Sequence, residues 1–279
     1  MNPSFSTRKM INIGCGTVFH YDWINLDLVS MDPSVKVWDL RRGFPFPDHS
    51  IDICYSSHFL EHLSQAETTQ VLHDCFRVLR QGGIIRLVVP DLEAVVNAYL
   101  NSLKQVDYDN PLSIDQHEWM TIELIDQMVR TQTGGAMGLY LRSGRNREFV
   151  RSRLGEEADW FWSRTDHSDG WFQKVKDKSL PQLLRLVRER LLLMMVRVTL
   201  GQSAMQGVQE GLFRNRGEVH RWMYDRVSLA KLLEDVGFVS VQLCAPEQSQ
   251  ITNFNTYELD VKKGEVFRPH SLYIEAKKD

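Results

Sequence analysis

The sequence predicts an α/β fold in which a parallel sheet is interrupted by a largely helical insertion and then completed. Short apolar runs alternate with helical periodicity from Lys9 to about Leu103, as in βαβ units. Helical periodicity with few strand-like runs follows, and the alternation returns near the C-terminus. We therefore expect a sheet-forming part at 1–103, an insertion at 104–218 and a completion of the sheet at 219–279.

Five strands are expected before the insertion: Lys9–Ile13, Trp23–Leu28, Val35–Trp38, Ile51–Ser56 and Ile84–Val89. The helix between the last two has a clear signal, because Ser64 and Glu67 form a capping box and apolar residues follow at helical spacing. Gly82-Gly83 is expected to end this helix. Asp91 is a natural N-cap for a second helix that ends at Leu103.

The rest of the chain has fewer predicted elements. In the insertion, helical periodicity at 119–129 and at 183–200 surrounds a glycine-rich break at Gly134–Gly138, which could be the hinge of a lid. The C-terminal part is expected to form a helix at Ser228–Val236, stopped by Gly237, and strands at Phe238–Leu243 and Leu272–Ala276.

The composition is that of an ordinary globular protein. The 279 residues are 43% hydrophobic and 25% charged, which is enough for one large core or two smaller ones. The net charge of −3 lacks the basic excess of most nucleic-acid binders. The four cysteines contain no C-x-x-C pair, so neither a disulfide framework nor a thiolate zinc site is expected, and a cytoplasmic location fits.

No secretory signal or membrane-spanning segment is expected. Met1–Met10 lead into a strand rather than an apolar run with a cleavage site. The most apolar stretch, Leu191–Val196, is far shorter than the roughly 20 residues that span a bilayer. Residues 183–198 do form an apolar helical stripe beside arginines. This stripe is expected to pack on the rest of the chain or on a second subunit, with an anionic membrane surface as the alternative.

A glycine pair follows the first strand, and an acidic residue ends the second. Gly14 and Gly16 would let a ligand approach the backbone closely, and Asp27 could accept both hydroxyls of a ribose. The third glycine of a dinucleotide fingerprint is missing, and Asp27 comes sooner than the roughly 20 residues of that pattern. The spacing therefore favours an adenosine ligand such as S-adenosylmethionine over NAD, although glycines in such turns are often only structural.

Further motifs follow in order: W-I-N-L-D at 23–27, W-D-L at 38–40, F-P-F-P-D at 44–48, S-S-H-F-L-E-H at 56–62, V-L-R-Q-G-G at 78–83 and H-R-W-M-Y-D at 220–225. In this order they resemble the class I S-adenosylmethionine-dependent methyltransferases. The G-C-G to W-I-N-L-D segment resembles a type 11-like bacterial subgroup that is associated with surface-polysaccharide and small-molecule biosynthesis. The resemblance implies a Rossmann-like sheet, mostly parallel with an antiparallel last strand.

The resemblance also implies which residues bind the cofactor: Gly14, Cys15, Gly16, Asp27, Leu28, Asp39, Leu40 and Ser56. Asp27 would bind the ribose hydroxyls, and Asp39 would lie beside the adenine amino group with Leu40 on the ring. Ser56 would border the methionine part. Two departures are visible, since Asn12 replaces the family's first-strand acid and the helix after the glycine loop must be truncated or absent.

Three histidines are candidate catalytic residues. His58 leaves the fourth strand at the edge where open α/β sheets bind ligands, and a neutral imidazole suits the removal of a hydroxyl proton. His62 is either catalytic or a structural residue near a helix start. His220 is either a second base or part of a capping network around Asp225. Residues 58–62 also fit the zinc-protease pattern H-x-x-E-H, but they begin in a loop rather than a helix, so no metal is assigned and metal assistance stays open.

Two groups in the insertion could contact the acceptor. An arginine-rich stretch suits an anionic acceptor such as a diphosphate-linked sugar, or else forms a solvated face paired with Glu156, Glu157 and Asp159. Its members are Arg142, Arg145, Arg147, Arg151 and Arg153. An aromatic cluster either walls an acceptor pocket or packs in the core, and it comprises Trp160, Phe161, Trp162, Trp171 and Phe172.

The expected function is methyl transfer from S-adenosylmethionine to an oxygen of a sugar, polysaccharide precursor or other small metabolite, with S-adenosylhomocysteine as product. Motifs of amine methylation and of covalent pyrimidine methylation are absent. One alternative is an RNA methyltransferase that uses the arginines, although nucleic acid is not an expected partner at this net charge. The other is a catalytically inactive scaffold that keeps the fold and forms a homodimer through the insertion.

Overall fold

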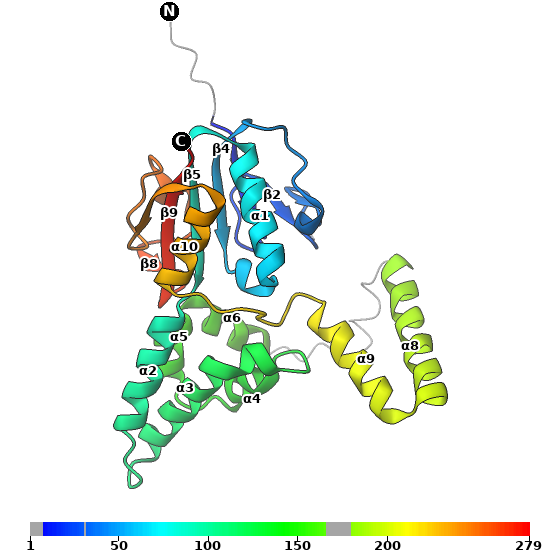
Figure 1. Cartoon of the computed structure of the whole chain (residues 1–279). Coiled ribbons are helices and arrows are strands. Elements are labelled where there is room, and N and C mark those ends of the chain that lie inside the picture. The colour runs from blue at the N-terminus through cyan, green and yellow to red at the C-terminus, as the bar shows by residue number, and fades with distance from the viewer. Residues whose placement is uncertain (1–7, 31, 166–179) are drawn as a thin grey trace, which may run out of the picture.

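The computed structural model describes residues 8–30, 32–165 and 180–279, and a seven-stranded sheet lies at its centre (Figure 1). The strand order is β3-β2-β1-β4-β5-β9-β6. β9 runs antiparallel to both neighbours, and the other pairs are parallel, which confirms the predicted sheet. The bounds are Met10–Ile13 (β1), Ile24–Asp27 (β2), Val35–Val37 (β3), Ile51–Ser57 (β4), Leu79–Pro90 (β5), Val239–Leu243 (β6) and Ser271–Lys277 (β9).

Two helices, α1 (Gln65–Val78) and α10 (Arg226–Val236), cover one face of the sheet (Figure 1). Side chains at alternate strand positions point to this face, and Ile11 of β1 packs in one core with Leu72 of α1 and Leu233 of α10. The alternation is the usual consequence of the strand pleat, which sends successive side chains to opposite faces. The face that remains must therefore be covered by something else.

α1 begins at the predicted capping box of Ser64 and Glu67, but it ends at Val78 and not at Gly82-Gly83. The ammonium group of Lys278 donates hydrogen bonds to the carbonyl oxygens of the last turn of α1 and of the residue after it. This cation satisfies the helix C-terminus, where a glycine was expected to do so. The glycine pair lies instead inside β5, where its backbone pairs with that of Lys278.

A segment between β6 and β9 covers the other face of the sheet. It contains η3 (Phe254–Tyr257) and a small ribbon of β7 (Val261–Lys262) and β8 (Glu265–Val266). Phe254 of this segment packs with Tyr55 of β4 in a second core. The sequence analysis predicted none of these elements, because each is too short to show a periodic pattern.

Arg86 of β5 fastens this segment to the sheet. Its guanidinium is fully buried and donates to Asp260 and to Glu275, at 2.7 Å in each case. The group also stacks over the ring of Phe254, with 4.7 Å from its central carbon to the ring centroid. Asp260 accepts a further hydrogen bond from the hydroxyl of Tyr55 (2.6 Å). Both buried carboxylates are thus paired through one side chain.

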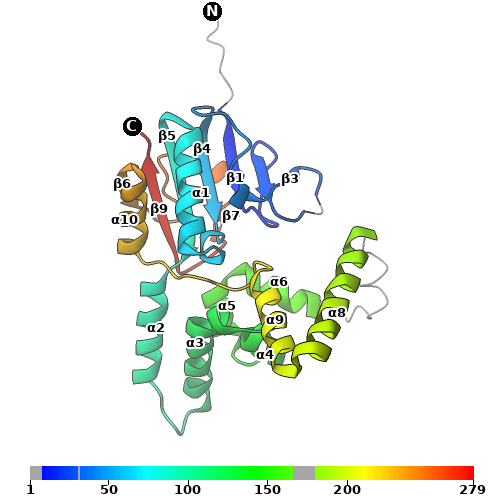
Figure 2. The ribbon, with the colours of Figure 1, turned by 45° about the vertical axis from the view of Figure 1, so that its right-hand side comes forward.

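The insertion between β5 and α10 is helical throughout its described part, as predicted. Figure 1 shows α2 to α6 at the end of the sheet to which the parallel strands point, and Figure 2 shows α2 and α3 side by side. Trp119 and Tyr140 are central to a third core within these helices. The helices are α2 (Leu92–Lys104), α3 (Pro111–Val129), α4 (Gly135–Ser143), α5 (Arg147–Leu154), α6 (Glu156–Thr165), α8 (Leu180–Leu200) and α9 (Gln202–Arg214).

The apolar stripe of α8 is largely exposed in the described part of the chain. α8 packs on α9, to one side of the other helices (Figure 1). The exposed fraction is 61% for Leu191 and 76% for Val198. The stripe is exposed at Leu184, Val187, Leu191, Met194, Met195 and Val198, whereas the side chains of Leu183 and Arg185 lie outside the described residues. The described part of the chain thus leaves these six side chains exposed, and packing on a second subunit or on an anionic membrane surface stays a prediction.

No helix within 8–30, 32–165 and 180–279 combines the length and the apolar character needed to cross a bilayer.

We expect Arg86→Ala to lower the free energy of unfolding by about 3–5 kcal/mol, because Asp260 and Glu275 would be left as buried, uncompensated carboxylates. Urea denaturation followed by circular dichroism measures this. Lys9→Ala, which removes an exposed cation at the same sheet, is the control and should change the value by no more than about 0.5 kcal/mol. A loss below about 1 kcal/mol for Arg86→Ala would contradict the role of the buried pairs.

Candidate active site

The loop after β1 carries the glycine pair and runs to β2 without a helix, as expected. Two buried amides hold this loop at its ends. Nδ2 of Asn12 donates to the carbonyl oxygen of Val18 (3.1 Å), and Nδ2 of Asn25 donates to that of His20 (3.0 Å). Asn12 thus holds backbone at the position where the family has an acid. Asn25 was not predicted to have a role, since an asparagine within a strand gives no distinctive signal.

The glycine loop and Asp27 meet at the carboxyl ends of β1 and β2. Gly14 has a φ of +64°, and a side chain there would collide with the ring of Phe59. Gly16 has a φ of +53° and open space beside it. One carboxylate oxygen of Asp27 accepts from the N–H of Gly16 (2.8 Å), and the other accepts from the N–H of Val29 (3.1 Å). A fixed carboxylate beside an open glycine backbone fits the ribose of an adenosine ligand.

Asp39 has a partner of its own. It caps η1 (Leu40–Arg42), and its Oδ1 accepts from Nε of Arg41 at 2.8 Å. The hydrogen bond from Arg41 holds the pKa of this carboxyl below its usual value. Leu40 is buried in the main core and does not present its side chain to solvent. Asp39 is therefore an ionised acceptor near β3 whose two oxygens are shared with an arginine.

The remaining predicted cofactor residues differ in exposure. Ser56 is buried at the end of β4, and its hydroxyl donates to the carbonyl oxygen of Ile13 (2.9 Å). Cys15 is buried, and this burial, with the nearby charge of Asp27, raises the pKa of its thiol to about 12. Leu28 is exposed just after β2. Ser56 and Cys15 therefore stabilise the loop from inside, whereas Leu28 is available to a ligand.

A cavity of about 770 Å³ lies between the end of the sheet and the insertion. The sheet contributes His58, at the end of β4, and Pro90, at the end of β5. The glycine loop contributes residues 17–20, and the insertion contributes side chains of α2 to α6. Residues 267–271 close it from the C-terminal segment. Asp27 and Asp39 do not line this cavity, which adjoins the adenosine-fitting part of the site through residues 17–20 of the glycine loop.

Aromatic and paired charged groups line the insertion side of the cavity. Trp160 and Phe161 are in its wall, as one reading of the aromatic cluster predicts. Trp162 instead donates from Nε1 to the carbonyl oxygen of Leu141 (3.1 Å), and Trp171 and Phe172 lie outside the described residues. Two buried or half-buried ion pairs lie in the same wall, Arg153 with Glu123 (2.6 Å) and Arg268 with Glu157 (2.9 Å).

The predicted arginine patch is mostly engaged with acids. Arg145 pairs with Asp115 and Glu118 at 2.9 Å, and Arg151 pairs with Asp159 at 2.8 Å. Pairing with acids agrees with the alternative of a paired face, but Asp159 is the predicted partner that takes part, whereas Glu157 pairs with Arg268 and Arg153 is buried. This pairing weighs against a surface that binds phosphate.

The glycine-rich break is a packed helix start, which argues against a hinge. Gly134 caps α4 in a left-handed conformation, and a side chain at Gly135 would collide with the carboxylate of Asp126. That carboxylate accepts from the N–H of Ala136 (2.7 Å) and pairs with Arg130 (2.7 Å). Small residues are required here because a buried acid approaches the helix N-terminus closely.

His58 reaches from the sheet edge into the cavity. Its φ of +50° lies outside the extended range of a strand, so β4 ends before it. Its backbone N–H donates to the carbonyl oxygen of Val88 (2.8 Å). Nε2 lies 2.9 Å from the hydroxyl of Ser271, and Nδ1 lies 3.5 Å from Oε1 of Glu61. Burial lowers the pKa of this imidazole well below its ordinary value, so that it is neutral near pH 7. The predicted position of His58 at the ligand-binding edge is confirmed, whereas its role stays a prediction.

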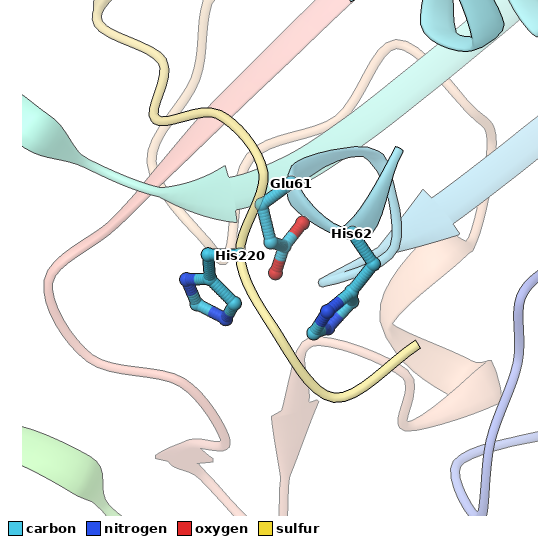
Figure 3. Close-up of side chains that lie close together, drawn as sticks. All are labelled: Glu61, His62 and His220. Atoms are coloured by element: carbon cyan, nitrogen blue, oxygen red, sulfur yellow. The ribbon is translucent and has the colours of Figure 1, made fainter. Parts of the chain in front are cut away.

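His62 and His220 come together beside Glu61 (Figure 3). Glu61 and His62 belong to η2 (Leu60–His62), and His220 lies on the segment that returns from α9 to α10. The two imidazole rings are 4.8 Å apart, edge to face. Burial lowers the pKa of both histidines, and it does so more strongly for His220. The second-largest cause of the low pKa of His220 is the nearby His62.

Two interpretations of these histidines change with the structure. His62 precedes α1 by a loop and is not a residue of its first turn. Asp225 does cap α10, since it accepts from the N–H groups of Val227 and Ser228, but His220 is not part of that network.

Glu61 is the member of this group that the sequence analysis did not single out as a candidate. Its side chain is fully buried, and neither carboxylate oxygen accepts a hydrogen bond. Burial raises the pKa of this carboxyl to about 8. The acid was visible in the 58–62 motif, but only the fold shows that it is buried without a hydrogen-bond partner among the described residues.

Residues 11–87 match the family model of the methyltransferase domain. The matched part runs from β1 into β5 and contains the glycine loop, Asp27 and residues 58–62. The match and the strand order agree with a Rossmann-like methyltransferase sheet, mostly parallel with an antiparallel last strand.

Similarity to solved structures is remote, and no curated protein matches the chain. A SAM-dependent methyltransferase from Archaeoglobus fulgidus is 13% identical, with 97% of this chain and 86% of that one covered and a TM-score of 0.40. The CurJ carbon methyltransferase is 11% identical over 98% of this chain and 49% of that one, at a TM-score of 0.38. A methyltransferase in complex with the Haloferax volcanii Trm112 activator is 18% identical, with 38% of this chain and 55% of that one covered and a TM-score of 0.28.

The protonation of Glu61 should make stability depend on pH. The folded state holds a proton between the ordinary pKa of 4.5 and about 8 that the unfolded state releases, so the free energy of unfolding falls as the pH rises through this range. Each unit of pKa corresponds to about 1.4 kcal/mol. We expect Glu61→Gln to remove this dependence, so that the variant gains several kcal/mol relative to the wild type between pH 5 and pH 8.

Urea denaturation at both pH values, with a chelator present, measures this difference. Glu148→Gln, which changes an exposed acid, is the control and should follow the wild type. Parallel pH profiles for Glu61→Gln and the wild type would show that Glu61 is ionised in the folded protein.

Proposed function

We propose that this protein transfers a methyl group from S-adenosylmethionine to a hydroxyl of a small, sugar-containing acceptor bound in the 770 Å³ cavity. The observation that carries the proposal is the position of this cavity. It lies at the carboxyl ends of the parallel strands, where open α/β sheets bind their ligands, and His58 is in its wall. The insertion would then serve as the acceptor-binding part of the chain, with α2 included in it, although the expected division put the start of the insertion at residue 104.

The cofactor would be held by residues on the β1–β3 side of the sheet. Asp27 would receive the ribose hydroxyls, and the backbone at Gly14 and Gly16 would lie along the nucleoside. Asp39 would lie beside the adenine, with its charge shared with Arg41. When bound, S-adenosylmethionine supplies an electrophilic methyl group.

His58 is suited to take the proton of the acceptor hydroxyl. Its imidazole is neutral near pH 7, and its Nε2 contacts the hydroxyl of Ser271 in the cavity wall at 2.9 Å. A base in this position typically contributes about 10²–10⁴ to the rate, and alignment of the acceptor can contribute about 7–11 kcal/mol. The cavity wall, built from both the sheet and the insertion, would supply that alignment.

The chemistry of the wall favours a carbohydrate. Trp160 and Phe161 offer apolar faces for a sugar ring, and Gln127 and Glu156 offer groups that hydrogen-bond hydroxyls. The two arginines of the wall are already paired with acids, so an anionic acceptor would depend on Lys262, an exposed cation of the lining. The acid pairs of Arg145 and Arg151 weigh against the RNA alternative, and the methyl-transfer assay below tests the inactive-scaffold alternative.

We expect Asp27→Ala to weaken S-adenosylmethionine binding by at least about 100-fold, because the ribose loses its acceptor and the glycine loop loses the hydrogen bond at Gly16. Isothermal titration calorimetry with S-adenosylmethionine and S-adenosylhomocysteine, and NAD as a negative ligand, measures this. Asp22→Ala changes an exposed acid of the same loop and is the control. Equal affinity in Asp27→Ala and Asp22→Ala would refute the assignment of the cofactor site.

The reaction itself is tested by radiolabelled methyl transfer to a panel of free, nucleotide-linked and lipid-linked sugars. For an accepted sugar, we expect His58→Gln to lower kcat by about 10²–10⁴ while calorimetry shows unchanged cofactor affinity. His73→Gln, on the exposed side of α1, is the matched control. Transfer at the wild-type rate by His58→Gln would exclude it as the base, and transfer only to compounds without a sugar would overturn the acceptor class.

A further inference from the structure

We propose that Glu61, His62 and His220 form a binding site for one divalent transition-metal ion. The three residues each offer a ligand atom, and these atoms lie within 4.8 Å of one another. Figure 3 shows the carboxylate of Glu61 directed toward the space between the two imidazole rings. The site is separate from the residues that fit the cofactor, and it does not depend on the reaction proposed above.

The distances between the ligand atoms are close to what one ion requires. Ligands at about 2.1 Å from a tetrahedral ion lie about 3.4 Å from each other. The ligand atoms must therefore approach one another by at most about 1.4 Å to share one ion, and rotation of the side chains can provide this. The backbone at these positions is already fixed, because the carbonyl oxygen of Glu61 accepts from the N–H groups of Arg221 (2.6 Å) and Trp222 (3.3 Å).

The second line of support is the absence of partners for buried polar atoms. Both carboxylate oxygens of Glu61 and the Nδ1 of His220 are buried and make no hydrogen bond, although Glu61 is fully buried and His220 is only 4% exposed. Buried polar groups in proteins nearly always have a partner, and a carboxylate without one is costly. A single cation at this point would satisfy the oxygen and nitrogen atoms together.

The orientation of His62 fits a ligand as well. Its Nδ1 lies 3.3 Å from the carbonyl oxygen of Val219, which makes Nδ1 the protonated nitrogen and leaves Nε2 with a free lone pair. Metal-binding histidines commonly donate their other N–H to a backbone carbonyl in this way.

The donor set selects the class of metal. Two imidazole nitrogens and one carboxylate oxygen suit zinc, cobalt, iron or nickel, whereas magnesium and calcium prefer oxygen ligands. His58 is not one of the three ligands but lies next to them, with its Nδ1 3.5 Å from Oε1 of Glu61. It also lines the cavity. The ion would therefore lie directly behind the cavity wall and tie η2 to the segment that returns from the insertion.

The test uses the full-length, untagged chain after removal of metal with a chelator. Titration with Co²⁺, followed by visible absorption, should show one ion per chain with the d–d bands of a nitrogen–oxygen site, and Zn²⁺ should displace it. Glu61→Gln and His220→Gln should each weaken Co²⁺ binding by about 100-fold or more. Loss of a residue that only supports a metal ligand costs about 10–100-fold in affinity, and loss of a ligand itself should cost at least as much. His73→Gln and Glu148→Gln change exposed residues and should bind as the wild type does.

Folding of each stripped variant is checked by circular dichroism, and His62→Gln replaces any variant that does not fold. Zn²⁺ should also raise the melting temperature of the wild type but not that of Glu61→Gln. The proposal is overturned by no stoichiometric binding to the wild type, or by equal binding to the wild type and the three variants. S-adenosylmethionine titrations on the same stripped samples test the proposed function separately, because Asp27 and Gly16 are not ligands.

Discussion

The active-site end of this molecule depends on one crossing of the chain. On its way from α9 to α10, the segment at 219–224 passes under η2, and the carbonyl oxygen of Glu61 accepts from two of its N–H groups. The N–H of His220 donates to Gln127 of α3 (2.9 Å), and the N–H of Leu92 donates to Tyr224 (2.9 Å). These backbone hydrogen bonds join the sheet to the insertion. They fix the floor of the cavity and bring His220 to Glu61.

Two buried ionisable groups, Arg86 of β5 and Glu61 of η2, have opposite environments. Arg86 is enclosed by two carboxylates, carbonyl oxygens and aromatic rings, so its burial is compensated and it can anchor the C-terminal segment. Glu61 is equally buried but has no hydrogen-bond partner. Structural positions tend toward the first state, because an uncompensated charge costs several kcal/mol. The second state is typical of positions where a proton or a ligand completes the environment.

Local sequence signals gave correct elements wherever the physics is local. The capping box at Ser64, the N-cap at Asp91 and the alternation of the strands depend on neighbours a few residues away, and all are present. Errors arose where a distant group decides. Lys278 ends α1 before the glycine pair, and Asp126 explains the glycines of α4 as packing rather than motion. The stripe of α8 has the periodicity of a buried helix, yet periodicity does not reveal what covers it.

The sequence by itself predicted the class of the sheet through the order of its motifs, and it predicted the glycine loop, Asp27 and the position of His58 at a strand end, because strands and caps follow from short-range patterns. Only the tertiary structure decided the rest of the site. The cavity wall combines side chains from α3, α6 and residues 267–271, and His220 lies beside Glu61 although the whole insertion separates them in the sequence. Such contacts depend on how separate elements pack and on which buried groups find partners, and neither property is written in the spacing of residues along the chain.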